Sequence, residues 1–238
     1  FRRNPDKGGF AIFGGLEQIV EYILNLHFDE RDIAYLRDQG IFSDEFLDYL
    51  KDFSFKGDVY AFPEGSIIYP NEPVITIVAP LIDAQIVETA VLTMMNHQSL
   101  IATKANRIVR AADGRVVADF GARRAHNVDA AVYGARAAYI GGVASTATVL
   151  AGQQFGIPVS GTMAHSWVMY YGSEYDAFKA YAEVYPDNAV FLVDTYDVLN
   201  SGVPNAIQVA KDVLEPMGKR LKGIRLDSGD LAYLARKA

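Results

Sequence analysis

The sequence contains no cysteine among its 238 residues. Disulfide bonds, thiolate zinc sites and a cysteine nucleophile are therefore excluded for this chain. It also has no apolar run that approaches the roughly 20 residues needed to cross a bilayer, and its first residues do not resemble a signal peptide. We therefore expect a cytoplasmic protein with no membrane partner.

Positive charge is also in short supply. The chain has 22 Lys and Arg residues against 29 Asp and Glu, which gives a net charge of −7. Binding to nucleic acid needs clustered cations that neutralise phosphates, so we expect no nucleic-acid partner. A small anionic ligand stays compatible with this composition, because local arginines and helix N-termini can outweigh the overall sign.

Apolar and aromatic residues are abundant. Half of the residues are hydrophobic, and 14 Tyr and 13 Phe argue against disorder. The chain opens on FRRNPDKGG without an initiator Met and stops at LAYLARKA, inside a helical pattern. We expect it to be a piece of a longer polypeptide.

The first 113 residues mix helices with short strands. Helical periodicity and cap signals predict helices over 16–26, 29–40 and 43–53, and residues 54–79 read as short strands between Gly and Pro turns. A long helix is predicted from Asp83 to about Ala112. Its predicted apolar stripe consists of Ile86, Ala90, Met94, Ile101, Ala105 and Ile108.

After Asp113-Gly114 the pattern becomes regular. Five strand-then-helix units are predicted, with strands at VVADFG, IGG, IPVSGT, AVFLVDT and GIRLDSGD. These strands are nearly continuous apolar runs, as expected when both faces of a sheet are buried. Parallel strands with helical crossovers predict either a doubly wound sheet or a barrel.

Polar residues follow each predicted strand. In parallel α/β architecture these strand ends meet on one face, where ligands bind. Arginine pairs grip phosphate, carboxylates suit Mg²⁺ or ribose hydroxyls, and helices predicted to start at Ser145 and Ser166 direct free N–H groups there. Together these groups suit a phosphorylated sugar. The residues are Arg123, Arg124, Gly141, Gly142, Ser145, Thr146, Thr162, His165, Ser166, Asp194, Thr195, Arg225, Asp227, Ser228 and Asp230.

His165 stands at one of these junctions, in the predicted first turn of a helix. The helix dipole disfavours the imidazolium there, which leaves a neutral and nucleophilic ring, and it would stabilise a phosphoryl group carried on that ring. The alternative is that His165 only caps or packs. His97 lies on the predicted apolar stripe and is expected to be a satisfied core histidine, whereas His126, two residues after the arginine pair, stays ambiguous.

Several motifs taken together resemble the nicotinate phosphoribosyltransferase family. They are FGARRAHNVDAAVYGARAAYIGG, VLAGQQFGIPVSGTMAHS, FLVDTYD and IRLDSGDLAY, and the opening FRRNPDKGGFAIFGGLEQIV and the helix ETAVLTMMNHQSLIATKA fit as well. The resemblance implies an α/β N-terminal domain with a long linking helix over 1–113. It also implies the first part of an irregular, incomplete (β/α) TIM-like barrel over 114–238, usually within a homodimer.

The resemblance also implies a reaction. It is the transfer of phosphoribosyl from phosphoribosyl pyrophosphate to nicotinate, which gives nicotinate mononucleotide and pyrophosphate in NAD salvage. The family couples this step to ATP through a phosphohistidine and requires Mg²⁺. It has further substrate-binding parts before FRRNP and after the last residue of this chain.

Site roles follow from the same resemblance. His165 matches the phosphorylated histidine, and Asp227 joins it as a catalytic residue. The carboxylates considered for Mg²⁺ or ribose hydroxyls are Asp194, Asp227 and Asp230. Phe120 matches the position that stacks on the pyridine ring. Arg123 matches an arginine at the site of the phosphate and the ring, and Thr162 matches a position near nicotinate. The expected substrate-binding set is Phe120, Arg123, Gly141, Gly142, Thr162, Ser166, Asp194 and Arg225.

Two alternatives stay open, and a third is disfavoured by the motifs. Nicotinamide phosphoribosyltransferase shares DFG-x-R and a histidine-serine pair, although GTMAHS and FGARRA favour the acid over the amide. Quinolinate phosphoribosyltransferase shares the architecture but not these motifs. An alternative of another class is a catalytically silent barrel that only binds a nucleotide or a partner.

Overall fold

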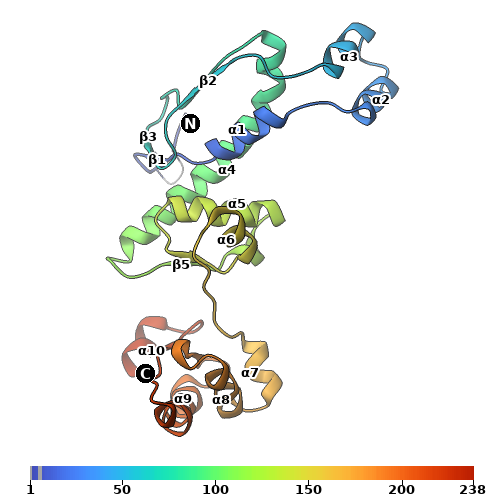
Figure 1. Cartoon of the computed structure of the whole chain (residues 1–238). Helices are drawn as coiled ribbons and strands as arrows, with labels where there is room; N and C mark the ends of the chain where they lie inside the picture. Colours follow the sequence, from blue (N-terminus) through green and yellow to red (C-terminus); the bar gives the residue numbers. More distant parts are fainter. Residues whose placement is uncertain (1, 5–6) are drawn as a thin grey trace. The chain divides into compact units, whose positions relative to one another are not determined.

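The computed structural model describes residues 2–4 and 7–238 and divides into two compact units, one up to Ser160 and the other Gly161–Ala238 (Figure 1). Residues 114–160 pack with the first unit, chiefly because helix α5 lies along helix α4. The predicted domain division after residue 113 stays a prediction. No helix in the described part of the chain combines the length and the apolar character needed to cross a membrane.

The first unit opens with short elements. Its helices are α1 (Leu16–Asn25), α2 (Glu30–Asp38) and α3 (Asp44–Lys51), and its first strands are β1 (Ala11–Ile12), β2 (Asp58–Ala61), β3 (Ile67–Ile68) and β4 (Ile75–Val78). β1 pairs with β3 and β2 with β4, both antiparallel. Asp29 caps α2 in a capping box with Asp32, and Ser43 caps α3, so the predicted caps are confirmed.

Helix α4 (Leu81–Ala111) confirms the predicted long helix, and the predicted apolar stripe is partly right. Ile86, Met94 and Ile101 are half-buried and pack against apolar clusters, but the most buried face lies beside this stripe. Of its members only Ala105 is buried, and Ile108 is 50% exposed. The buried apolar face instead carries Val87, Val91, Met95, Ala102 and Ala105. Buried polar residues continue this face and hold the N-terminal segment, because Ser99 Oγ accepts the Gly14 N–H and Thr103 Oγ1 accepts the Ile12 N–H.

Helix α5 (Val128–Ile140) is joined to the N-terminal elements by the buried Arg136. Its guanidinium contacts both carboxylate oxygens of Glu64, at 2.9 and 2.6 Å, and also pairs with Glu17. Glu64 in turn accepts the N–H groups of Gly15 and Leu16 at the start of α1. One buried ion pair therefore ties α5 to α1 and to the turn before β3.

A small parallel sheet follows in the same unit. β5 (Ala118–Asp119) pairs with β6 (Ser145–Thr146), and Thr146 bridges to Val159 in parallel. The predicted strand at IGG is wrong, because Ile140 ends α5 and the two glycines form the turn after it. The helix predicted from Ser145 begins instead with α6 (Val149–Phe155), so Ser145 lies on a strand.

The second unit packs helices around a two-stranded parallel sheet of β7 (Val190–Leu192) and β8 (Gly223–Arg225). The helix predicted from His165 is two helices, α7 (His165–Tyr171) and α8 (Glu174–Val184), separated where Gly172 has a φ of 75°. Stacked rings of Phe178 and Phe191, 4.8 Å apart, mark the core. The remaining elements are η3 (Pro186–Asn188), η4 (Val198–Gly202), α9 (Val203–Val209), η5 (Ala210–Leu214), η6 (Glu215–Met217) and α10 (Leu231–Lys237).

The mixed α/β fold class is confirmed. The strands of the described residues form four two-stranded sheets, and no closed barrel is present among them. In both parallel sheets the pairing joins strands that are separated by helices along the chain, as the strand-then-helix pattern predicts.

Candidate active site

His165 is the first residue of α7 and lies against the ends of β7 and β8. Its Nδ1 is 3.1 Å from Thr195 Oγ1, which follows β7. Its Nε2 is 3.5 Å from Asp227 Oδ2 and 3.9 Å from Asp194 Oδ1. The ring is 37% exposed, so a ligand can reach it from solvent. A hydroxyl therefore faces one ring nitrogen and two carboxylates face the other.

Asp227 lies between the histidine and an arginine. Its Oδ1 is 2.9 Å from Arg225 Nη2, while Oδ2 faces His165. The hydrogen bond and the positive charge of Arg225 lower the pKa of Asp227 despite partial burial, and the neighbouring His165 contributes to the lowering. Asp227 is therefore ionised at neutral pH, and it can hold a ring proton and stabilise positive charge on the imidazole.

Asp194 is the buried support of this arrangement, with a side chain only 2% exposed. Its Oδ2 accepts the Asp227 N–H at 3.0 Å and the Ser228 hydroxyl at 2.6 Å. These bonds fix the loop after β8 against the end of β7. Its Oδ1 is buried without a hydrogen-bond partner and lies nearest the histidine ring. Asp194 acts here by positioning, and its expected contact with substrate stays a prediction.

Arg225 connects the same loop to the segment before α7. Its Nη1 donates to Thr162 Oγ1 at 2.6 Å, and Nη2 pairs with Asp227. The guanidinium fork thus spans two groups with fixed geometry, which an ammonium group would not reproduce. The prediction that polar strand ends converge is confirmed within the second unit, where Thr162, His165, Asp194, Arg225 and Asp227 meet.

Four residues of the expected substrate-binding set, Phe120, Arg123, Gly141 and Gly142, belong to the first unit. Phe120 follows β5 and is 41% exposed, and Arg123 lies exposed on the short turn Ala122–Arg124. That turn is held by Asp119, whose Oδ1 accepts the Gly121 N–H and whose Oδ2 accepts the Thr146 hydroxyl. The ligand roles of Phe120 and Arg123 stay predictions.

Gly141 and Gly142 have packing roles in the structure. A Cβ at Gly141 would lie 2.5 Å from the Ala102 carbonyl oxygen on α4. Gly142 has a φ of +102°, which a residue with a side chain rarely adopts. Their predicted approach to the ligand stays a prediction, as does the role of Ser166, the exposed second residue of α7.

The other histidines lie apart from this group. His97 is half-buried, and its Nε2 lies 3.2 Å from the Ala130 carbonyl oxygen, in agreement with the predicted satisfied histidine. His97 and the exposed His126 line a cavity of about 270 Å³ together with Asp119 and Arg124. This cavity lies in the first unit and is lined in part by the turn Ala122–Arg124.

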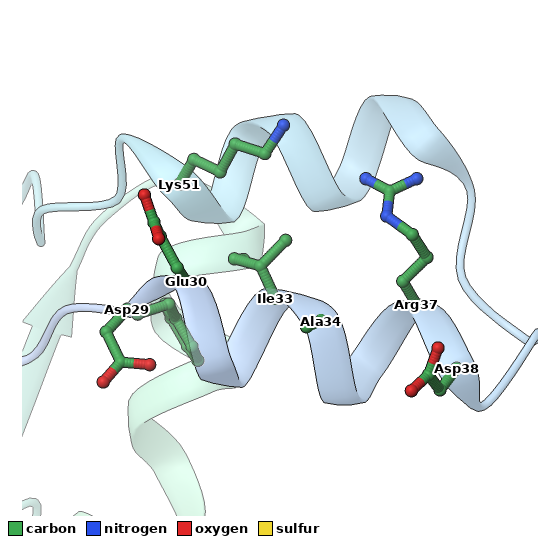
Figure 2. A pocket seen from close by; sticks show the side chains of 8 residues that line it. Asp29, Glu30, Ile33, Ala34, Arg37, Asp38 and Lys51 are labelled. Carbon is green, nitrogen blue, oxygen red and sulfur yellow. The ribbon is translucent and has the colours of Figure 1, made fainter.

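A second cavity, of about 540 Å³, lies between α2 and α3. Figure 2 shows Arg37 and Lys51 beside Ile33 and Ala34 at this cavity. Arg37 pairs with Asp44, and Lys51 lies 2.5 Å from Asp48. None of the site residues predicted from the sequence lines this cavity, so its size does not mark the candidate site.

The described residues form no metal site from side chains alone. Within 2–4 and 7–238, no group of three or more His, Cys, Asp or Glu side chains is arranged to hold one. Asp227 uses one oxygen on Arg225 and turns the other to His165, and Asp194 Oδ2 receives two donors. Asp230, also considered for metal or ribose, caps α10 through the Tyr233 N–H.

Two residues of the site, Thr195 and Ser228, had no role assigned to them from the sequence. Thr195 and Ser228 stand at predicted strand ends, yet only the structure shows that Thr195 faces the histidine ring and that Ser228 donates to Asp194. The feature that could have identified them is their position directly after a predicted strand, which the residues with assigned roles share.

The chain is thus a mixed α/β protein with a carboxylate-flanked histidine at the ends of parallel strands. It belongs to the nicotinate phosphoribosyltransferase family. The model of that family's N-terminal domain matches residues 1–96, and the model of the nicotinate phosphoribosyltransferase (NAPRTase) family matches residues 116–238.

Individual relatives agree with the family match. The chain is 52% identical over 240 residues to the nicotinate phosphoribosyltransferase of Bacillus subtilis (strain 168), covering 100% of this chain and 48% of that protein. It is 49% identical to a nicotinate phosphoribosyltransferase of Mycobacterium tuberculosis, covering 99% of this chain and 50% of that one. The chain spans about half the length of the curated relatives it matches.

Solved structures show the same likeness. The human nicotinic acid phosphoribosyltransferase superposes with a TM-score of 0.89 at 31% identity, covering 99% of this chain and 57% of that one. A nicotinate-nucleotide pyrophosphorylase from Pyrococcus furiosus gives a TM-score of 0.78 at 29% identity, covering 99% of this chain and 53% of that chain.

Proposed function

We propose that the polypeptide to which this chain belongs transfers phosphoribosyl from phosphoribosyl pyrophosphate to nicotinate, and that ATP drives this transfer through a phosphoryl group carried on His165. The observation that carries the proposal is the setting of that ring, with Asp227 at 3.5 Å and Thr195 at 3.1 Å on opposite nitrogens. The names of the relatives support the substrate assignment.

The phosphoryl step uses His165 as the nucleophile. A ring nitrogen attacks the terminal phosphorus of ATP, the N–P bond forms as the bridging O–P bond breaks, and ADP leaves. Positive charge grows on the ring in this step, and the carboxylate of Asp227 stabilises it because its pKa is low and it stays ionised. Asp194 holds the backbone of Asp227, so the carboxylate is already in place.

The phosphoribosyl step joins the pyridine nitrogen of nicotinate to the anomeric carbon while the bond from that carbon to pyrophosphate breaks. We place Phe120 against the pyridine ring and Arg123 at its carboxylate or at phosphate. Arg225 binds on the ribose side, and Thr162, to which it is joined by a 2.6 Å hydrogen bond, lies near nicotinate. Gly141, Gly142, Ser166 and Asp194 complete the substrate-binding set in this proposal.

ATP can drive the transfer only if phosphorylation of His165 favours one of two states of the substrate site. A phosphoryl group there would add negative charge beside Asp227 and Asp194, so it would weaken their present arrangement around the ring. Coupling follows only if the two states differ in affinity for substrate. The proposal is that the phosphorylated state holds phosphoribosyl pyrophosphate more tightly.

The wider assembly is part of the same proposal. We infer that residues 114–238 form the beginning of an incomplete barrel, which the other half of the polypeptide extends, and that the protein acts as a homodimer. The length of the relatives supports the first point. Mg²⁺ would enter with the pyrophosphate, since the described residues build no site for it. The cytoplasmic location stays a prediction.

The test is nucleotide formation by the complete polypeptide with nicotinate or nicotinamide, with and without ATP. We expect nicotinate mononucleotide to form at a rate that ATP raises, and we expect His165→Ala to abolish the effect of ATP. Preference for nicotinamide would favour the amide enzyme instead. Absence of product with either pyridine would favour a silent nucleotide-binding protein.

A further inference from the structure

The segment that carries Asp194 and Thr195 returns onto its own starting point. It leaves β7 at Val193 and comes back at Gly202, which is buried. A Cβ added at Gly202 would lie 1.9 Å from the Val193 carbonyl oxygen and 2.8 Å from the Val193 Cα. The two ends of the loop 194–201 are therefore in direct backbone contact.

Glycine is needed at position 202 because there is no room for a side chain, and not because of its backbone conformation. Gly202 has a φ of −59° and a ψ of −52°, a conformation open to any residue. The atoms that an added methyl group would meet belong to the backbone of a buried strand end, which cannot rotate away as a side chain would. An alanine here must push the strand end and the loop apart.

The loop reaches Gly202 through a wide turn, η4 (Val198–Gly202), of the π type. Asp197 builds this turn with its side chain, which accepts the N–H groups of Leu199 and Asn200, and its carbonyl oxygen accepts the Gly202 N–H at 2.7 Å. Single π-turns interrupt regular helices and are frequent near functional sites. Here the turn delivers Gly202 to the base of the loop.

A buried carboxylate anchors the returning end. Glu174, the first residue of α8, is 2% exposed, and the Ser201 hydroxyl donates to its Oε2. Asn205 contacts the same oxygen at 3.5 Å and the Ser201 carbonyl at 3.0 Å. Hydrogen bonds to a buried carboxylate are costly to lose, so this anchor fixes the residue next to Gly202.

We propose that Gly202 is a positioning residue for the phosphorylation of His165, an inference that rests on the proposed function. Closure of the loop 194–201 at Gly202 fixes Thr195 against Nδ1 of the ring, and it fixes Asp194, which in turn holds Asp227. Displacement of Val193 moves the next two residues first, and these are Asp194 and Thr195.

The test compares Gly202→Ala with Gly223→Ala in the complete polypeptide. Gly223 is the matched control, because it lies on β8 of the same sheet and an added Cβ there meets nothing within 4 Å. Two readouts are taken: the rate of transfer of ³²P from γ-labelled ATP to the protein, and the imidazole ¹⁵N signals of His165, assigned by their loss in His165→Gln.

We expect Gly202→Ala to slow labelling by about 10²-fold, the effect of a misplacement near 1 Å, and to shift the His165 imidazole signals. Gly223→Ala should change neither readout. A folded Gly202→Ala protein with parental labelling and unshifted imidazole signals would overturn the proposal. A purely structural role would lower the melting temperature without shifting those signals below it, and that result would overturn it as well.

A second variant covers the case in which Gly202→Ala does not fold. Ser201→Ala removes the hydroxyl that anchors the loop to Glu174. It adds no atom at the backbone contact between Gly202 and Val193. Shifted His165 signals in this variant support the proposal, and unshifted signals overturn it. If the parent protein takes up no label, the phosphohistidine function fails, while the imidazole signals still decide whether Gly202 positions the ring.

Discussion

Nε2 of His165 and Oδ2 of Asp227 lie 3.5 Å apart at the ends of two neighbouring parallel strands. The other oxygen of Asp227 is bound by Arg225, which keeps the carboxylate charged and oriented. Charge that develops on the ring during its attack on phosphorus therefore faces a carboxylate that is already ionised and fixed. The proposed chemistry depends on this pair.

Asp227→Asn removes the negative charge that faces His165 while keeping the shape of the side chain. We expect the rate of His165 phosphorylation to fall by roughly 10²-fold to 10⁴-fold, the range for a carboxylate that orients a catalytic histidine. Stopped incubations with γ-labelled ATP measure this rate. Asp187→Asn, which removes an exposed ion pair with Lys219 in the same unit, is the control and should label at the parental rate. Equal rates in both variants would contradict the role of Asp227.

The Arg136–Glu64 ion pair should carry far more stability than an exposed pair. Glu64→Gln leaves the buried guanidinium without its main partner, and we expect a loss of about 3 kcal/mol in the free energy of unfolding. Asp48→Asn breaks the exposed pair with Lys51 and should cost far less stability, because solvent screens that pair. Urea titrations followed by circular dichroism compare the two. Similar losses would mean that burial does not strengthen the Arg136 pair.

The Arg136–Glu64 pair also predicts how the free energy of unfolding depends on pH. Desolvation raises the pKa of Glu64, but the hydrogen bond and charge of Arg136 and the N–H groups of Gly15 and Leu16 outweigh it, so the pKa is lowered. A group with a depressed pKa contributes its full stability above its ordinary pKa and loses it as pH falls through the lowered value. The urea midpoint should therefore drop in acid more steeply for the parent than for Glu64→Gln. Parallel curves would contradict this assignment.

Gly134 within α5 and Gly141 directly after it should respond in opposite ways to the same substitution. Gly141→Ala drives a methyl group to 2.5 Å from the Ala102 carbonyl oxygen, and we expect a destabilisation of about 1–3 kcal/mol. At Gly134 the nearest atom, His97 Nε2, would be 3.8 Å away, an ordinary contact. Gly134→Ala should stabilise the protein by about 0.5–1 kcal/mol, because a helical glycine loses more backbone entropy on folding. Thermal unfolding gives both signs, and stabilisation by Gly141→Ala would refute the close helix contact.

Much of the helical framework was predictable from the sequence, because periodicity and caps are local signals. The long helix α4 and the capped helices α2 and α3 appear within a few residues of their predicted limits. The buried face of α4 was not predictable. Ser99 and Thr103 are polar, yet they are buried because they bond to Gly14 and Ile12, and no local pattern reveals partners more than 80 residues away.

The strands were harder to place for a related reason. IGG looks like an apolar strand, but the contact of Gly141 with α4 makes it the end of a helix. In the site, strand-end position predicted the meeting of His165, Asp194 and Asp227. It did not predict that Asp194 would be the buried support, since burial depends on how the loop after β8 folds over it.

The central claim is that His165 accepts a phosphoryl group from ATP. The most direct measurement is to incubate the complete polypeptide with γ-³²P-ATP, trap the protein in alkali, where phosphohistidine survives, and locate the label by peptide mapping. The account predicts acid-labile label on the peptide that contains GTMAHS, and none in His165→Gln. Label on another peptide, or no label in a protein that still makes nicotinate mononucleotide with ATP stimulation, would contradict it.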